Sequence, residues 1–183
     1  MASITVLQFD MTGLRDLIRE VLSLPDKTVR DADQAAPTGA VAFVTVRELT
    51  TNEVGRARRD FDGATEIERI CMSVETSVSI NAHGNDALAL MKKLAVMFQS
   101  SAGIQGMRKH KGHILRLSPV RNLSGIAGAG QEERAQMDIV ISHEHKVEVD
   151  LKRIDQGDVT VTTTDGLTAT THIDATTITT EHT

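Results

Sequence analysis

The sequence of 183 residues contains few aromatic residues, with four Phe, no Trp and no Tyr. Proteins that bind bases or sugars by stacking depend on aromatic rings, so this shortage argues against such binding as the main function. A single cysteine, Cys71, excludes an intrachain disulfide and a cysteine-rich zinc site. No signal peptide and no apolar run of about 20 residues is found, so we expect a soluble protein made in a reducing cytoplasm.

The sequence also lacks an excess of basic residues, with 20 Lys and Arg against 25 Asp and Glu. The formal net charge is therefore −5 and the isoelectric point is about 5.8. This balance argues against general binding to nucleic acids or acidic membranes. It is compatible with a surface past which DNA moves without being held.

The stretch 66–100 predicts a strand that leads directly into a helix. Apolar residues occupy every second position over 70–82, the pattern of a strand with one face on a core. The apolar spacing becomes helical over 88–98, and Asn85 or Asp86 is expected to cap this helix. A strand followed at once by a helix must fold the helix back over the sheet, which fixes a two-layer body.

The other elements follow from the same periodicities and from turn residues. The sequence predicts an edge strand or a loose arm over 1–9, a helix over 12–22 capped by Thr12, a connection over 26–38, a strand over 41–48, a long charged loop over 50–65, a short helix over 101–111, an edge or bulged strand over 113–121, a Gly-rich surface loop over 122–133, and a strand over 134–145 that continues, after a bulge or without one, through 147–151. The predicted fold class is α/β (α+β), with an antiparallel or mixed sheet of four or more strands and helices on one face.

The composition changes abruptly after Lys152, where Thr becomes the dominant residue. Asp165 and Gly166 lie between β-prone segments, which predicts a hairpin. The apolar residues there are too few for an independent core. We therefore divide the chain into a domain over 1–152 and a Thr-rich β extension over 153–183, which is either a strand added to another chain or a loose terminus.

Three patterns invite an enzymatic interpretation, and each has a simpler one. His143 and His145 lie two residues apart and would share one face of a strand, as two metal ligands can, but no cysteine or HExxH motif supports them. The glycines of 125–130 resemble a phosphate-binding loop, but a strand follows and no GK[ST] sequence occurs. No nucleophile–base pair or GxSxG motif is present. We predict neither catalysis, nor a bound cofactor, nor a metal site.

Arg56, Arg58 and Arg59 form a basic cluster among acidic residues in the predicted loop. A mixed-sign cluster is usually a solvated loop. Arginine is also enriched in protein–protein interfaces, and long loops are often functional. The residues that we expect to contact other proteins are Arg56, Arg58, Arg59, Ile126, Arg134, Val159 and Val161.

Four segments together resemble the tail-terminator, or neck-terminator, proteins of tailed bacteriophages. Their order and spacing agree with that family over about 14–149. The segments are Val29-Arg-Asp-Ala-Asp-Gln-Ala-Ala-Pro37 with Gly39-Ala-Val-Ala-Phe-Val-Thr-Val46, Ser77-Val-Ser-Ile-Asn-Ala-His-Gly84 with Asn85-Asp-Ala-Leu-Ala-Leu90, Leu117-Ser-Pro-Val-Arg-Asn-Leu-Ser124, and Glu133-Arg-Ala-Gln-Met-Asp-Ile-Val140.

The resemblance implies a structural virion protein of the tail and neck region that is assembled in the host cytoplasm. It implies a closed homo-oligomeric ring, usually a hexamer, which caps the tail tube and forms the docking face for the head connector. Implied partners are the tail tube protein, the neck or connector protein of the head, and the sheath protein if the tail is contractile, while genomic DNA passes through the lumen. Two alternatives remain open, a head-completion or connector subunit and a metal-binding enzyme.

Overall fold

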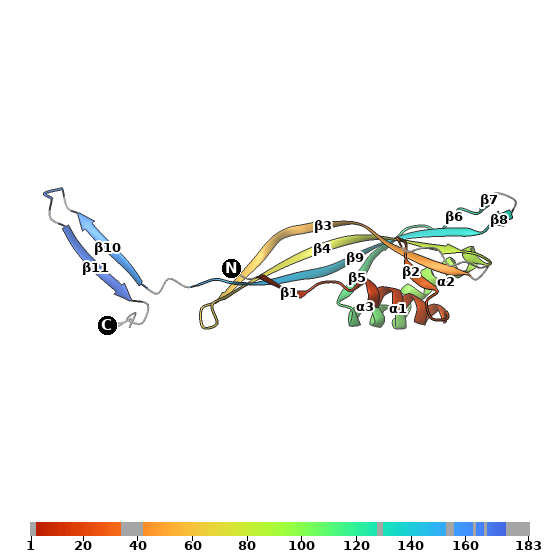
Figure 1. The fold of residues 1–183 in the computed structure, drawn as a ribbon, viewed down its shortest axis with the longest axis horizontal. Helices are drawn as coiled ribbons and strands as arrows, with labels where there is room; N and C mark the ends of the chain where they lie inside the picture. The colour runs from red at the N-terminus through yellow and green to blue at the C-terminus, as the bar shows by residue number, and fades with distance from the viewer. Residues whose placement is uncertain are drawn as a thin grey trace.

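The computed structural model describes residues 3–33, 42–127, 130–152, 156–162, 164–166 and 168–174. It contains three helices and a large sheet in the described part of the chain (Figure 1), which confirms the predicted mixed α+β class. The helices are α1 (Met11–Leu22), α2 (Ala87–Phe98) and α3 (Ser101–Lys109). The strands are β1 (Ser3–Leu7), β2 (Val29–Asp31), β3 (Phe43–Asp62), β4 (Ile67–His83), β5 (Gly112–Leu117), β6 (Arg121–Asn122), β7 (Gly125–Ala127), β8 (Gly130–Glu132), β9 (Arg134–Asp150), β10 (Gln156–Thr162) and β11 (Thr168–Asp174).

The main sheet has seven strands in the order β1-β9-β4-β3-β2, with β5 and β6 also paired to β9. All pairs are antiparallel except β2 with β3, so the sheet is mixed. The pair β4–β9 runs without a bulge from Ile67 opposite Asp150 to His83 opposite Arg134. At about 3.3 Å per residue, each of these 17-residue strands is about 55 Å long, far beyond an ordinary strand.

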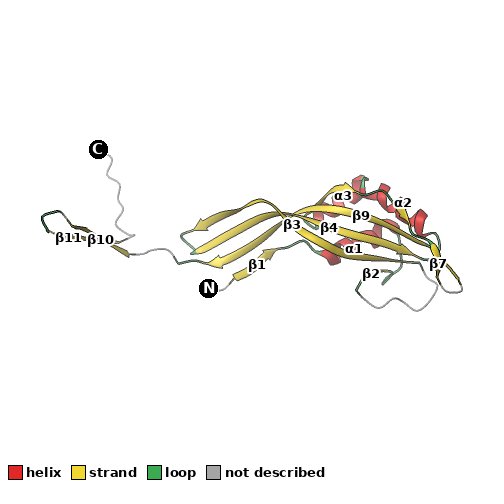
Figure 2. Ribbon diagram, turned by 90° about the horizontal axis from the view of Figure 1, so that it is seen from above, coloured by secondary structure: helices red, strands yellow, loops and turns green. Residues whose placement is uncertain are grey.

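The three helices cover one face of one half of this sheet (Figures 1 and 2). Alternation along β4 and β9 directs Val78 and Ile80 to that face, opposite Ile139 and Met137, and all four are fully buried. Leu14, Ile18, Met91, Leu94 and Met107 pack onto them from the helices. The predicted strand over 70–82 is confirmed, and the end of its apolar row from Val78 to Ala82 packs in the core beneath the helices.

The other half of the sheet has no helical cover, and we call it the arm: β1, residues 52–62 of β3, 67–73 of β4 and 144–150 of β9, with the turn at 63–66. Figure 2 shows these strands extending past the helices. Among the described residues, the buried core cluster includes none from the arm. The predicted charged loop over 50–65 is therefore wrong, since most of it is the second half of β3. Charged side chains are tolerated there because nearly every residue of β3 beyond Val46 is exposed.

Several boundaries differ from the sequence prediction for local reasons. The N-cap of α1 is Asp10, whose Oδ1 accepts a 2.8 Å hydrogen bond from the backbone N–H of Thr12. At α2 the N-cap position is Asp86, but its side chain makes no capping bond, and a Glu133 oxygen accepts from its N–H at 2.8 Å. The strand expected over 113–121 is divided into β5 and β6. The expected bulge lies within β5, between Ile114 and Arg116.

Two segments expected to be irregular contain strands. The connection over 26–38 contains β2, and its residues from 34 on, with Val41 of the next predicted strand, lie outside the described residues. The Gly-rich segment forms the backbone pair β7–β8, whereas residues 128–129 are outside the described part. The edge strand over 1–9 is confirmed as β1, and β9 continues from 145 to 150 without a bulge against β4.

Strands β10 and β11 form a separate two-stranded sheet in register from Gln156 opposite Asp174 to Thr162 opposite Thr168 (Figure 1). The turn between them includes Gly166 at a φ of 80°. The predicted Asp165–Gly166 hairpin is confirmed. In the described part of the chain, no helix is long and apolar enough to span a membrane.

Candidate interaction surfaces

The outer edge of β3 is the longest open strand edge among the described residues. The inner edge of β3 pairs with β4. On the outer edge, β2 pairs only with residues 44–46, so the outward-facing backbone groups of 47–62 pair with no other described strand. Two irregularities interrupt this edge, between Glu48 and Thr50 and between Val54 and Arg58, where Gly55 has a φ of 78°. Bulges and charges of this kind discourage uncontrolled edge-to-edge pairing.

The three predicted contact arginines all lie on this part of β3. Arg56 lies in the bulge, Arg58 is opposite Cys71, and Arg59 is opposite Ile70, so the last two project from opposite faces of the arm. All three side chains are exposed. Nη2 of Arg58 lies 3.9 Å from Sγ of Cys71. The structure brings these arginines together on one edge but not on one face.

The two faces of the arm differ in chemistry. The side that continues the helix-covered face carries Ile70, Met72, Val147 and Val149 along the β4–β9 pair, all half-buried without a covering layer. The opposite side carries ion pairs, from Arg69 to Glu148 at 2.9 Å and from Lys146 to Glu144 at 2.8 Å. Further exposed apolar side chains on the arm are Ile4, Val6, Val54 and Phe61. By register Glu68 and His145 share the first side, and Ile4 and Val54 share the side of the ion pairs, so each side also exposes residues of the other kind. Uncovered apolar side chains of this kind suit contact with other chains.

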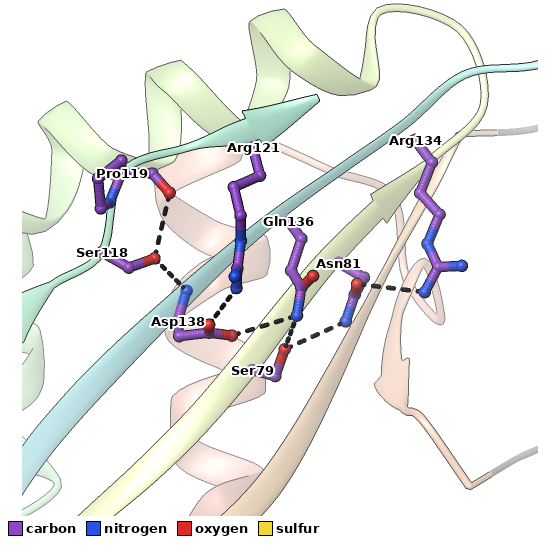
Figure 3. Close-up of polar contacts among 8 residues, drawn as sticks. All are labelled: Ser79, Asn81, Ser118, Pro119, Arg121, Arg134, Gln136 and Asp138. Carbon is purple, nitrogen blue, oxygen red and sulfur yellow. Dashed lines mark hydrogen bonds and ion pairs between the residues drawn. The ribbon is translucent and has the colours of Figure 1, made fainter. Parts of the chain in front are cut away.

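A polar network occupies the helix-free face at the opposite end of the sheet (Figure 3). Gln136 Nε2 donates to Ser79 Oγ at 2.8 Å and to Asp138 at 3.3 Å. The Asp138 carboxylate pairs with Arg121 on β6, while its backbone N–H donates to Ser118 Oγ at 2.8 Å. These contacts attach β6 to the sheet. They also give the buried Ser79 hydroxyl a hydrogen-bond partner, as buried polar groups require.

Arg134 belongs to the same network. Its Nη2 donates to Oδ1 of Asn81 at 3.3 Å, and its backbone carbonyl accepts from the N–H of Leu123 at 2.7 Å. The guanidinium therefore has a structural partner as well as an exposed side for contact. Sequence reasoning missed the other members, although the alternating small polar residues of β4 were the signal for one row of them.

The remaining predicted contact residues are placed by backbone register. Ile126 lies opposite Gln131 in the β7–β8 pair, Val159 opposite Thr171, and Val161 opposite Ala169. These positions are distant in the topology from Arg56 and its neighbours, because β7–β8, β10–β11 and the main sheet are three separate sheets. The seven residues therefore do not form one site.

The histidines considered as metal ligands lie on β9. Nε2 of His143 is 2.9 Å from Oγ1 of Thr76, and its ring centroid is 5.2 Å from that of Phe9. Burial lowers the pKa of His143 below its usual range, against the opposing effects of the Glu144 backbone and the Glu48 charge. Within the described ranges, no group of three or more His, Cys, Asp or Glu side chains is arranged to hold a metal ion.

A cleft of about 630 Å³ lies where α2, α3 and β5 meet. Phe98, Ile104 and Met107 line it from the helices, and residues 113–117 line it from β5. Ile104 and Leu115 are 43% and 49% exposed, so an apolar part of the cleft is open to solvent. The sequence gave no direct signal for this cleft, because it depends on how the α2–α3 corner meets an edge strand.

Comparison with known proteins agrees with these features. No curated protein matches the chain. Residues 11–166, which include α1, the long strands and the whole of β10, match the family described as phage neck terminator protein. The match spans most of the chain, the helix-covered half of the sheet and all of the arm except β1. Together with a fold that displays open strand edges and an uncovered arm, it shows that this chain belongs to the phage neck terminator family of structural virion proteins.

Proposed function

We propose that the protein caps the tail tube at the phage neck, ends its polymerisation and provides the face to which the head connector docks. The observation that carries this proposal is the family match over 11–166. The division of the molecule supports it, because a helix-covered core half presents an arm whose outer edge pairs with no other described strand and whose residues are absent from the core cluster.

We further propose that copies of the chain form a cyclic ring, a hexamer, around a lumen through which DNA passes without sequence-specific binding. A ring needs a heterologous interface, in which one patch meets a different patch on the neighbour. The arm, the cleft beside β5 and the β10–β11 hairpin are three chemically different surfaces, which is what such an interface requires. The partners would be the tube protein on one side, the connector on the other, and the sheath protein in a contractile tail.

Two measurements test this proposal. Mass measurement of the purified protein at micromolar concentration should show hexamers, or monomers that become rings when tail tubes are added. Imaging of virions that carry a labelled chain should place the label at the tail side of the neck. A stable two-fold dimer that does not respond to tubes, or a label on the head side, would contradict the proposal, and the second result would favour a connector subunit.

The enzyme alternative has a separate test. Metal analysis of the purified protein should find no stoichiometric zinc or iron. Stoichiometric metal that is lost on replacing His143 and His145 would overturn the proposed structural role.

A further inference from the structure

Charge is distributed very unevenly along this chain. Residues 87–131, which we call the basic segment, contain seven Lys and Arg and no Asp or Glu, although the whole chain carries −5. The C-terminal residues 154–183 are the opposite, with five acidic residues and no Lys or Arg. The basic segment forms α2, α3, β5 and β6, so it surrounds the cleft. The two most strongly charged parts of the chain therefore have complementary sign.

The cleft has the shape and chemistry to receive an added strand. In the described structure β5 pairs only with β9, so the edge that faces away from β9 is open. An added strand would cover Leu115 and Ile104, and the walls of the cleft already contain Phe98 and Met107. Main-chain hydrogen bonds would hold the strand and the apolar wall would select its side chains. A DNA backbone would satisfy neither the open edge nor the apolar wall.

Cations lie on two of the elements that form this cleft, the C-terminal end of α3 and β5. Arg116 lines the cleft itself, and Arg108 and Lys109 end α3, one turn beyond Ile104 of the cleft wall. Lys111 lies in the turn to β5, and with Arg108 it lines a second hollow that shares His113 with the cleft. Arg108, Lys109, Lys111 and Arg116 are all exposed. Among the described contacts of these four, the only ion pair with a carboxylate is Arg116 with Glu75 at 3.8 Å. An acidic strand would thus gain attraction at the edge to which it adds.

The β10–β11 hairpin matches this site in length, pattern and charge. Its strands have seven residues each and β5 has six. Alternate register positions hold Val159 and Val161, opposite Thr171 and Ala169, while the positions between them are polar. An isolated two-stranded sheet is marginal in water, so the hairpin requires a surface to pack on.

The hairpin can reach the cleft of its own chain only with part of β10. Gly112 of β5 lies opposite His143, and β9 runs seven residues farther to Asp150, about 24 Å away along the strand. From Asp150 to Gln156 the chain spans at most about 20 Å, even when it is fully extended. The far end of β5 is opposite Ile139, farther still. Within one chain the first residues of β10 would therefore be used to span the arm, whereas the hairpin of another molecule can align all of β10 with β5.

We propose that the cleft beside β5 receives the acidic β10–β11 hairpin of a second copy of this chain, which adds a strand to the open edge of β5. This contact is heterologous, because the hairpin of each copy meets the cleft of the next. It rests on the proposed ring and specifies one of its interfaces. The outer edge of β3 is a poorer acceptor, since two register shifts interrupt its pairing with β4 and nearly all of its side chains from 47 to 62 are exposed.

A charge exchange in the full-length chain tests the pairing. Arg108→Glu with Lys109→Glu reverses the charge at the end of α3. Asp158→Lys with Asp174→Lys reverses the charge of the hairpin strands. Each pair alone should weaken self-association by at least about tenfold, and the effect should shrink at high salt because exposed charges are screened. All four together should restore it. Weakening without restoration, or no weakening, would overturn the proposal.

A mixture of two variants tests the direction of the contact. One variant is blocked by Ile104→Asp and Leu115→Asp in the cleft, and the other lacks 153–183, which contribute nothing to the described core. Each variant alone should not associate through this contact. When they are mixed, they should form one-to-one pairs, which native mass spectrometry detects as a species with the summed mass of one full-length and one truncated chain. Val96→Asp, on an α2 residue that is 69% exposed and does not line the cleft, is the matched control and should associate normally.

The outcomes separate this inference from the proposed function. If the truncated chain forms rings of normal size and caps tails, the hairpin contact is wrong while the terminator role stands. If mixed pairs form but no variant or wild-type chain binds tail tubes, the contact stands while the terminator role is wrong. Self-pairing of the truncated chain through the cleft would overturn the proposed occupant.

Discussion

Gly103 shows how one residue sets the corner between α2 and α3. A Cβ at this position would lie 2.2 Å from the carbonyl oxygen of Met97 and 2.9 Å from Cα of Phe98. Helix propensity alone predicts that Gly103→Ala stabilises α3 by about 1 kcal/mol. The clash is with backbone atoms, which cannot rotate away, so we expect the free energy of unfolding to fall by about 1–3 kcal/mol instead.

Urea denaturation of Gly103→Ala and of Gly125→Ala measures this effect. Gly125 has nothing within 4 Å of an added Cβ, so its variant should change stability by less than about 0.5 kcal/mol. A stabilised Gly103→Ala protein would show that the corner can open, and with it one wall of the cleft.

Two histidines couple stability to pH. Burial lowers the pKa of His143, and burial together with the nearby charge of Arg134 lowers the pKa of His83. The folded protein therefore prefers both rings neutral, and the unfolded chain binds more protons. Stability from these groups is present above the unfolded pKa of about 6.5 and is lost as the pH falls below it.

Urea midpoints at pH 7.5 and pH 5.5 should therefore differ, with the lower midpoint at the lower pH. The double variant His83→Gln and His143→Gln should show a smaller difference between the two pH values, since neither side chain can then gain a proton. His113→Gln, at an exposed position of β5, controls for the substitution itself. A pH dependence that is unchanged in the double variant would assign the effect to other groups.

At the scale of elements, the period of apolar residues predicted the helices and strands that pack on the core, and it failed for strand segments that do not face the core. The apolar rows of β4 and α1 could be recognised because each faces a core, as the burial of Ile80 and Ile18 shows. The second half of β3 has no core to face, so its sequence is charged and resembles a loop. Its strand structure comes from backbone pairing with β4 over Arg58–Asp62, which leaves no period in the side chains.

The arginines of the arm give a prediction at this scale. Replacing Arg56, Arg58 and Arg59 with Ala should leave the free energy of unfolding within about 0.5 kcal/mol of wild type, because all three are exposed. We expect the same variant to reduce the fraction of capped tails, since exposed arginines contribute to contacts between chains. Lys27→Ala, on the turn after α1, is the control cation. Capping at wild-type efficiency would show that these arginines are only solvated.

The candidate contact surfaces also show that the sequence predicts local structure better than contacts between distant segments. The hairpin could be recognised from the sequence, because Asp165 and Gly166 determine a turn locally. The cleft beside β5 depends on the bulge at Leu115 and on the close approach at Gly103, and neither has a signature in one sequence. The polar network around Asp138 likewise joins β6, β4 and β9, which are distant along the chain.

For the whole molecule, the uneven charge leads to a prediction about DNA. If the hairpin of a neighbour covers the border of the cleft, the assembled protein presents little positive charge. We expect no binding of duplex DNA at about 0.15 M salt with protein concentrations up to about 10 µM, where basic proteins bind nonspecifically.

The chain that lacks 153–183 provides the internal comparison for this prediction. Its deletion removes five carboxylates and Arg153, which changes the formal net charge from −5 to −1, and it also leaves the basic segment uncovered. The truncated protein should therefore retard duplex DNA at low salt more strongly than the full-length protein, with a steep salt dependence because phosphate contacts release counterions. Adding Arg108→Glu and Lys109→Glu to the truncated chain should abolish the retardation. Equal and strong binding by the full-length and truncated proteins would instead mean that the basic segment is open in the assembled state, so that α3 and β5 would line the path of the DNA.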